Sequence, residues 1–405
     1  MELHFDIERV EVLLLIASLV AIFTRKLRVP YSVGLVATGV VLSLFSIEPN
    51  LKLTRELIFT ILLPPLIFEA AFFLHWAELK RDFWVITIFA SIGVVLSAIV
   101  TAVGMHYFAD WQWIGALIFG VLIAATDPVS VIATFKEAGV QGRLRILVEA
   151  ESLFNDGMAA VLFAVVTAIA AGHAVTPGSV SLSLLQIVVG GIACGAAVAG
   201  VTLFLSGRSK DHLIELTFTT IAAYGSFLLA EHLHVSGVLA TLTAGLMMGN
   251  LGHLGIVSGR GRETVEAFWE YAAFVTNSLI FLLIGIREGQ QNFWALGTIA
   301  ATAILLVLAG RAVAIYPVSL LFAFGKKAVS ARHQHVMVWG GLRGALGLAL
   351  AMSLPENIPQ RNQIVTVTFA VVAFSIFVQG LTMTPVLRAM GELPGKLKKK
   401  KPENG

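Results

Sequence analysis

Residues 146–160 read ILVEAESLFNDGMAA, an apolar run of helix length that nevertheless carries several polar side chains. The polar residues are Glu149, Glu151, Ser152, Asn155 and Asp156. An ionisable group at membrane depth costs about 2.5–3.5 kcal/mol on insertion scales, so groups that persist there usually have a function. If this stretch crosses a membrane, its polar side chains indicate a binding site, and the rest of the chain must show what they bind.

The composition is that of a membrane protein. The 405 residues are 57% hydrophobic and 13% charged, and the mean hydropathy is +0.86. Apolar runs of about 17–25 residues, enough to cross a hydrocarbon core of roughly 30 Å, recur along the whole chain and leave no room for a sizeable soluble domain. We therefore expect an all-α polytopic membrane protein. The net charge of +3 then marks topology rather than a nucleic-acid partner.

Thirteen apolar runs are bounded by polar, proline or glycine clusters. They cover residues 10–24, 31–47, 54–74, 83–108, 113–135, 144–171, 183–206, 212–231, 235–250, 264–286, 293–323, 333–354 and 362–389. Glu2, Asp6 and Glu8 precede the first run in place of a basic leader, so we expect a true span rather than a signal peptide.

Basic residues sort to alternate loops, as short cytoplasmic loops require. One side receives Arg25, Lys26 and Arg28; Lys80 and Arg81; Lys136, Arg143 and Arg145; Arg208 and Lys210; Arg260 and Arg262; Lys326, Lys327 and Arg332; and the tail residues Lys396 and Lys398 to Lys401. The other side receives only Arg9, Lys52, Arg55, Arg287 and Arg361. An odd number of spans therefore predicts an outer N-terminus and a cytoplasmic C-terminus.

Two spans carry signals for a broken helix. Residues 122–135 read LIAATDPVSVIATF, in which Pro128 lacks an amide hydrogen and disfavours helical angles at Asp127. Residues 338–355 read VWGGLRGALGLALAMSLP, in which clustered glycines weaken the helix around Arg343. Unwound backbone in opposite halves of a chain is typical of inverted repeats that cross near the bilayer midplane.

The polar side chains of residues 146–160 fall on two helical faces. Ser152 and Asp156 share one face, and their oxygens, with the backbone carbonyl of Thr126, suit a hard cation. Asp127 is expected to contribute to the same transport site.

Glu151 and Asn155 lie about 100° around the helix from that face and are expected to support the site. Glu151 would neutralise a buried arginine, either Arg311 or Arg343, both of which fall inside spans. Asn155 would hold Asp127 or cap an unwound helix end. Glu149 receives no role.

The sequence contains none of the common motifs of a catalytic or metal site. Cys194 is the only cysteine, and no paired zinc-ligand motif, P-loop or nucleophile elbow occurs. We therefore expect no catalytic residue and no cofactor. A cation channel, which also uses intramembrane carboxylates, is the weaker alternative at this point.

Three motifs carry a family resemblance: ATDPV at 125–129, EAESLFNDG at 149–157 and GGLRGA at 340–345. They resemble the signature segments of monovalent cation/proton antiporters, in particular the prokaryotic NhaP-type sodium/proton exchangers. The resemblance implies exchange of Na⁺, and also Li⁺, for H⁺ by alternating access, with a K⁺/H⁺ antiporter of the same fold as the alternative. The Asn155-Asp156 pair resembles the branch that exchanges one cation for one proton electroneutrally.

The resemblance also implies an architecture. Residues 83–172 and 291–390 would form a moving core bundle, residues 1–82 and 173–290 the dimerisation domain of a homodimer, and residues 391–405 a short basic cytoplasmic tail. Without the long tails of animal exchangers, a prokaryotic inner membrane is the expected location, and pH and sodium homeostasis the expected role.

Overall fold

The structure is a computed structural model of the whole chain. It describes residues 7–27, 29–45, 56–127, 131–132, 135, 138–172, 177–208, 211–251, 259–291, 296–325 and 327–393.

All regular elements among the described residues are helices, and every predicted span overlaps one helix or helical segments in series. The elements are α1 (Ile7–Leu27), α2 (Tyr31–Leu44), η1 (Leu57–Leu62), α3 (Leu63–Phe72), α4 (Trp76–Ile88), η2 (Phe89–Gly93), α5 (Val94–Ala109), α6 (Trp113–Leu122), α8 (Arg143–Ala170), α9 (Pro177–Ser206), α10 (His212–His232), α11 (Gly237–Leu251), α12 (Gly259–Gly289), α13 (Gly297–Leu320), α14 (Ala331–Trp339), α15 (Ala345–Met352), α16 (Arg361–Phe374), η5 (Ser375–Gly380) and α17 (Leu381–Met390).

Seven helical stretches of the described chain are long and apolar enough to cross a membrane, and four further apolar helices are shorter. Two of the shorter ones, α6 and α11, still lie largely inside the protein. The prediction of an all-α polytopic membrane protein is confirmed.

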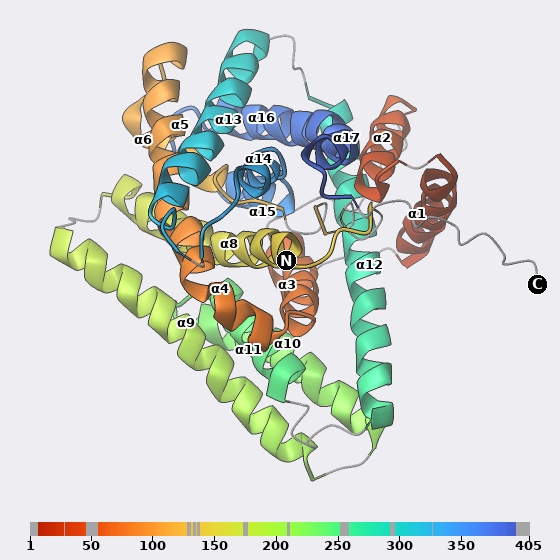
Figure 1. The fold of residues 1–405 in the computed structure, drawn as a ribbon. Coiled ribbons are helices and arrows are strands. Elements are labelled where there is room, and N and C mark those ends of the chain that lie inside the picture. Colours follow the sequence, from red (N-terminus) through yellow and green to blue (C-terminus); the bar gives the residue numbers. More distant parts are fainter. Residues whose placement is uncertain are drawn as a thin grey trace, which may run out of the picture.

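Two units of three spans contain the broken helices. The first comprises α4 to α5, then α6, then α8; the second comprises α13, then α14 and α15, then α16 to α17. Corresponding spans of the two units are seven positions apart in the series of thirteen, and successive spans alternate in direction, so the units traverse the membrane in opposite directions, as inverted repeats do. In Figure 1, α8 lies near the middle, between α13 to α16 on one side and α9 to α11 on the other.

Local sequence explains where the central helices begin. α8 begins directly after Gly142, whose φ of +78° is a left-handed conformation that favours glycine. Ser330 caps the start of α14, because its hydroxyl accepts a hydrogen bond of 3.2 Å from the amide of His333. These two positions define where α8 and α14 begin.

Candidate functional site

Two unwound segments meet at the centre of the fold. The chain is non-helical from Ala125 to Asp127 after α6, and residues 340–344 separate α14 from α15. The backbone amide of Asp127 donates a hydrogen bond of 2.8 Å to the carbonyl of Leu342. Irregular backbone is tolerated at membrane depth only where protein buries it or it lines a cavity. Both predicted breaks are present, although Pro128 lies outside the described residues.

Close approach explains the glycines of the second segment. A Cβ atom on Gly344 would lie 2.6 Å from the Cβ atom of Asp127, and one on Gly341 would lie 2.5 Å from Nε of Arg311. No side chain fits at such distances, so glycine lets the two segments and the neighbouring arginine come together.

Arg343 completes the end of α6. Its Nη1 atom donates hydrogen bonds of 2.8 Å to the carbonyl of Ala124 and 3.0 Å to the carbonyl of Ala125. These carbonyls lose their helical partners where the helix stops, and they carry the negative end of its dipole. The buried guanidinium of Arg343 therefore supplies hydrogen-bond donors to the free carbonyls at the end of α6 and offsets the negative end of the helix dipole.

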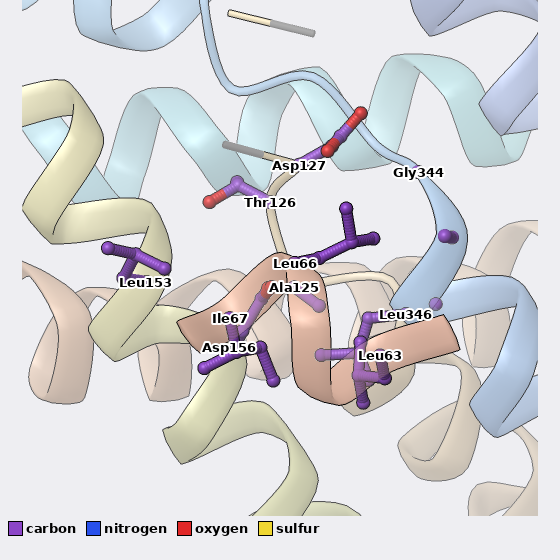
Figure 2. A pocket seen from close by; sticks show the side chains of 12 residues that line it. Leu63, Leu66, Ile67, Ala125, Thr126, Asp127, Leu153, Asp156, Gly344 and Leu346 are labelled. Carbon is purple, nitrogen blue, oxygen red and sulfur yellow. The ribbon is translucent and has the colours of Figure 1, made fainter. Parts of the chain in front are cut away.

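Asp127 lies at the N-terminal end of a helix. Its carboxylate packs against Gly344, the residue that precedes α15, so its negative charge lies at the positive end of that helix. In Figure 2 its side chain points away from Asp156 and toward the segment that leads to Gly344. Where the two unwound segments meet, Arg343 thus lies at the negative end of α6 and Asp127 lies at the positive end of α15.

A π-helical turn of the last span supports the second segment. The hydroxyl of Ser375 accepts a hydrogen bond of 2.8 Å from the amide of Arg343 and donates one of 2.8 Å to the side chain of Gln379. The amide group of Gln379 then donates 2.9 Å to the carbonyl of Trp339. Ser375 and Gln379 of this π-helical turn therefore hydrogen-bond to the backbone on both sides of the first two glycines of the second segment.

Asp156 lies beside the first segment. The side chain of Thr126 donates a hydrogen bond of 3.1 Å to the hydroxyl of Ser152, and the amide of Thr126 donates to the carboxylate of Asp156. Thr126, Ser152 and Asp156 are therefore close together, and the role of the Thr126 carbonyl as a cation ligand stays a prediction.

The carboxylate of Asp156 retains capacity for a ligand. It is 6% exposed, and within the described chain its Oδ1 atom has no hydrogen-bond partner. Buried polar atoms are nearly always partnered, so an orphan oxygen needs an explanation. A bound cation or proton would provide one.

A cavity of about 30 Å³ adjoins this carboxylate (Figure 2). A cavity needs roughly 10–15 Å³ to hold one water molecule, so this one has room for a small ion but not for an organic substrate. Apolar side chains line its remaining walls: Leu63, Leu66, Ile67, Leu153 and Leu346. The apolar lining strengthens any electrostatic interaction inside the cavity.

Glu151 pairs with Arg311. The two side chains form parallel hydrogen bonds of 2.7 and 2.8 Å, and both residues are buried, at 0% and 4% exposure. Arg311 also donates 3.1 Å to the carbonyl of Met337 at the end of α14. The pair therefore links α8, α13 and the second broken span, which resolves the choice of arginine that the sequence left open.

The other two polar residues of α8 have local partners. Asn155 donates a hydrogen bond of 3.4 Å to Glu151, four residues earlier, so its amide supports the ion pair; this differs from the expected roles of holding Asp127 or capping a helix end. Glu149, to which the sequence analysis gave no role, accepts a hydrogen bond of 2.5 Å from Arg145. Arg145 and Glu149 are spaced i,i+4 on one helix, so this pair could have been predicted from the sequence.

Comparison with known proteins agrees with this geometry. The family model described as sodium/hydrogen exchanger, transmembrane, matches residues 13–389. The low-affinity Na⁺/H⁺ antiporter NhaS1 of Synechocystis sp. is 35% identical over 410 residues, which cover 98% of this chain and 78% of the relative. The Na⁺/H⁺ antiporter ApNhaP of Aphanothece halophytica is 38% identical over 380 residues, covering 93% and 72%.

Solved structures agree in fold. The sodium proton antiporter MjNhaP1 from Methanocaldococcus jannaschii at pH 8 superposes with a TM-score of 0.75 and 20% sequence identity, over 97% of this chain and 98% of that one. Because the matched sequence region runs from α1 to α17 and includes both broken spans, the chain belongs to the sodium/hydrogen exchanger family.

Proposed function

We propose that this protein exchanges Na⁺, and also Li⁺, for H⁺ across the membrane by alternating access, with Asp156 as the carboxylate that carries either ion. The observation that carries the proposal is the orphan Oδ1 atom of Asp156 in a small buried cavity beside two crossing unwound segments. The names of the matched relatives, which are Na⁺/H⁺ antiporters, support Na⁺ rather than K⁺ as the cation.

The coupling follows from competition at one carboxylate. A proton and a cation cannot both occupy the Oδ1 position, so each crossing of the site carries one or the other. Ser152 and Thr126 supply the further oxygen ligands that a hard cation prefers, while Asp127 serves the site from the end of α15. Asp127 also lines the cavity, so the 1:1 stoichiometry rests instead on the Asn155-Asp156 pair, whose resemblance to the electroneutral branch supports exchange of one cation for one proton.

The position of the cavity supports a rocking mechanism. One wall consists of α3 residues, and the other walls come from α8, α15 and the two unwound segments. α5 packs on both α6 and α13, whereas α3 packs on α11 and α12. We propose that residues 83–172 and 291–390 form the moving core, that residues 1–82 and 173–290 form the dimerisation domain, and that relative movement opens the cavity alternately to each side.

Orientation and assembly are part of the same proposal. The distribution of lysine and arginine supports an outer N-terminus and a cytoplasmic C-terminus. The resemblance to NhaP-type exchangers supports a homodimer in a prokaryotic plasma membrane, where exchange would serve pH and sodium homeostasis. No catalytic group or cofactor enters this mechanism.

The test is cation-driven proton flux in proteoliposomes that carry a pH gradient, measured for Na⁺, Li⁺ and K⁺ with and without a clamped membrane potential. We expect Na⁺ and Li⁺ to move protons at rates that do not depend on the potential. Asp156→Asn should abolish the flux. A matched control is Asp110→Asn, because Asp110 is exposed and its left-handed φ of 53° suits asparagine equally well.

Three outcomes would contradict the proposal. Proton flux driven by K⁺ but not Na⁺ would make the protein a potassium antiporter. Cation flux without obligatory proton movement would make it a channel. Undiminished flux in Asp156→Asn would show that Asp156 does not carry the transported ion.

A further inference from the structure

A large apolar groove runs along the side of α8 that faces away from the ion cavity. Its volume is about 670 Å³, and α4, η2, α8, α9 and α11 all contribute to its lining. Phe83 and Phe154 meet across it with ring centroids 6.4 Å apart. The volume lies within the range of roughly 300–1,000 Å³ that ligand sites occupy.

The groove is separate from the ion pathway. Phe154 and Met158 of α8 line it, and each is two residues from Asp156, so they lie about 160° around the helix from the carboxylate. The ion cavity is instead lined by the Leu153 and Asp156 side of α8, together with α3, α15 and the unwound segments. Helix α8 thus has an ion site on one side and an apolar groove on the other.

The lining selects an apolar occupant. Twelve of the sixteen groove residues carry apolar or aromatic side chains, such as Val188, Ile192, Leu242 and Leu246. Apolar cavities do not hold water stably, and the surrounding solvent at this depth is lipid. Along α11 the groove extends from Leu239 to Leu251, a rise of about 18 Å, close to the thickness of one leaflet, which is about half of a 30 Å hydrocarbon core.

One end of the groove has the character of a membrane interface. The amide of Trp76 donates a hydrogen bond of 2.7 Å to the side chain of Asn250, which closes this end. Trp76 is 49% exposed, and tryptophan is enriched at the level of lipid head groups. This end belongs to the basic side of the protein, which the positive-inside rule assigns to the cytoplasm.

A lysine lies at the same end. Lys80 falls four residues after Trp76 and three before Phe83, which places it on the helix face that lines the groove. The ring contact between Trp76 and Phe83, at 6.4 Å between centroids, confirms that this face is continuous. Lys80 is exposed, and no ion pair joins it to the part of the chain that the structure describes. Its charge is therefore open to an anionic head group.

We propose that this groove binds an anionic phospholipid of the cytoplasmic leaflet, with an acyl chain between α8 and α11 and the phosphate beside Lys80. The groove supplies affinity for the chain, and the lysine supplies preference for a negative head group. The inference does not depend on which cation is transported.

The test is native mass spectrometry of the delipidated full-length protein, to which phosphatidylglycerol and phosphatidylcholine are added separately. We expect the wild-type protein to bind phosphatidylglycerol more tightly than phosphatidylcholine. Lys80→Gln should reduce this preference by about fivefold, which corresponds to about 1 kcal/mol per basic residue at an anionic surface. Thr243→Trp should remove the binding of both lipids, because Thr243 lines the groove.

Each variant has a matched control. Lys26→Gln removes an exposed lysine on the same basic side, at the end of α1. Thr217→Trp places the same bulk on the exposed face of α10, and both threonine hydroxyls bond only to the carbonyl four residues earlier in their own helix. The controls should bind lipid like the wild type. Wild-type lipid binding by Thr243→Trp, or an undiminished preference in Lys80→Gln, would overturn the proposal.

Discussion

Replacing Glu151 with glutamine tests whether the buried ion pair holds the core together. The substitution keeps the size of the side chain but leaves the charge of Arg311 without a counter-ion in a site where the two residues are 0% and 4% exposed. Breaking a buried pair by removing one partner costs about 3–5 kcal/mol, since the remaining charge is desolvated and uncompensated. Arg311 donates to both carboxylate oxygens, at 2.7 and 2.8 Å, and glutamine has only one acceptor oxygen, so one of the two hydrogen bonds is also lost.

The same helix provides the matched control. Glu149 also pairs with an arginine, but Arg145 is 35% exposed in its side chain, and exposed i,i+4 pairs contribute only about 0.3–0.5 kcal/mol. Thermal unfolding of the purified protein should therefore occur several degrees lower for Glu151→Gln than for Glu149→Gln.

The double variant Glu151→Gln with Arg311→Met should recover part of the loss, because it removes the orphan charge. Equal unfolding temperatures for wild type and Glu151→Gln would refute the structural role. If stability is unchanged while the apparent affinity for Na⁺ falls sharply, Glu151 is a direct cation ligand instead.

Two further substitutions address the crossing and the cation ligands. Ser152→Ala should raise the KM for Na⁺ by about tenfold, the effect of losing one neutral oxygen contact worth about 1–1.5 kcal/mol, with little change in unfolding temperature; an unchanged KM in the proteoliposome flux assay would remove Ser152 from the site. Gly344→Ala should greatly reduce both folded yield and exchange, since its Cβ atom would lie 2.6 Å from that of Asp127; size-exclusion profiles and flux equal to wild type would show that the two segments are not held this closely.

Much of the fold could be predicted because hydropathy reports membrane burial directly. The boundaries were less predictable where polar residues continue a helix beyond its apolar run. α4 begins at Trp76, well before the predicted residue 83, because Lys80 and Asp82 occupy turns of the same helix. α9 likewise begins at Pro177 rather than at residue 183.

Within the site, spacing along one helix predicted faces but not partners on other helices. It separated Asp156 from Glu151 correctly, yet both arginines remained open for Glu151 because the choice depends on how α13 packs against α8. The role of Arg343 at the carbonyls of Ala124 and Ala125 follows from the end of α6, which only the structure defines.

Two groups of residues were not singled out by the sequence analysis. Leu63, Leu66 and Ile67 line the cavity, but apolar residues in a span carry no signal of such a position. Ser375 and Gln379 did carry one, since two polar residues at i,i+4 spacing in an apolar run indicate a shared buried face.

The central claim is that Asp156 holds either a proton or Na⁺, and proton release on Na⁺ binding tests it most directly. Purified protein in weakly buffered detergent solution would be titrated with Na⁺ while a pH indicator reports released protons over a series of starting pH values. We predict that Na⁺ displaces up to one proton per chain, with the released amount rising as the starting pH falls, and that Asp156→Asn releases none. Na⁺ binding without proton release, or release that persists in Asp156→Asn, would contradict the account.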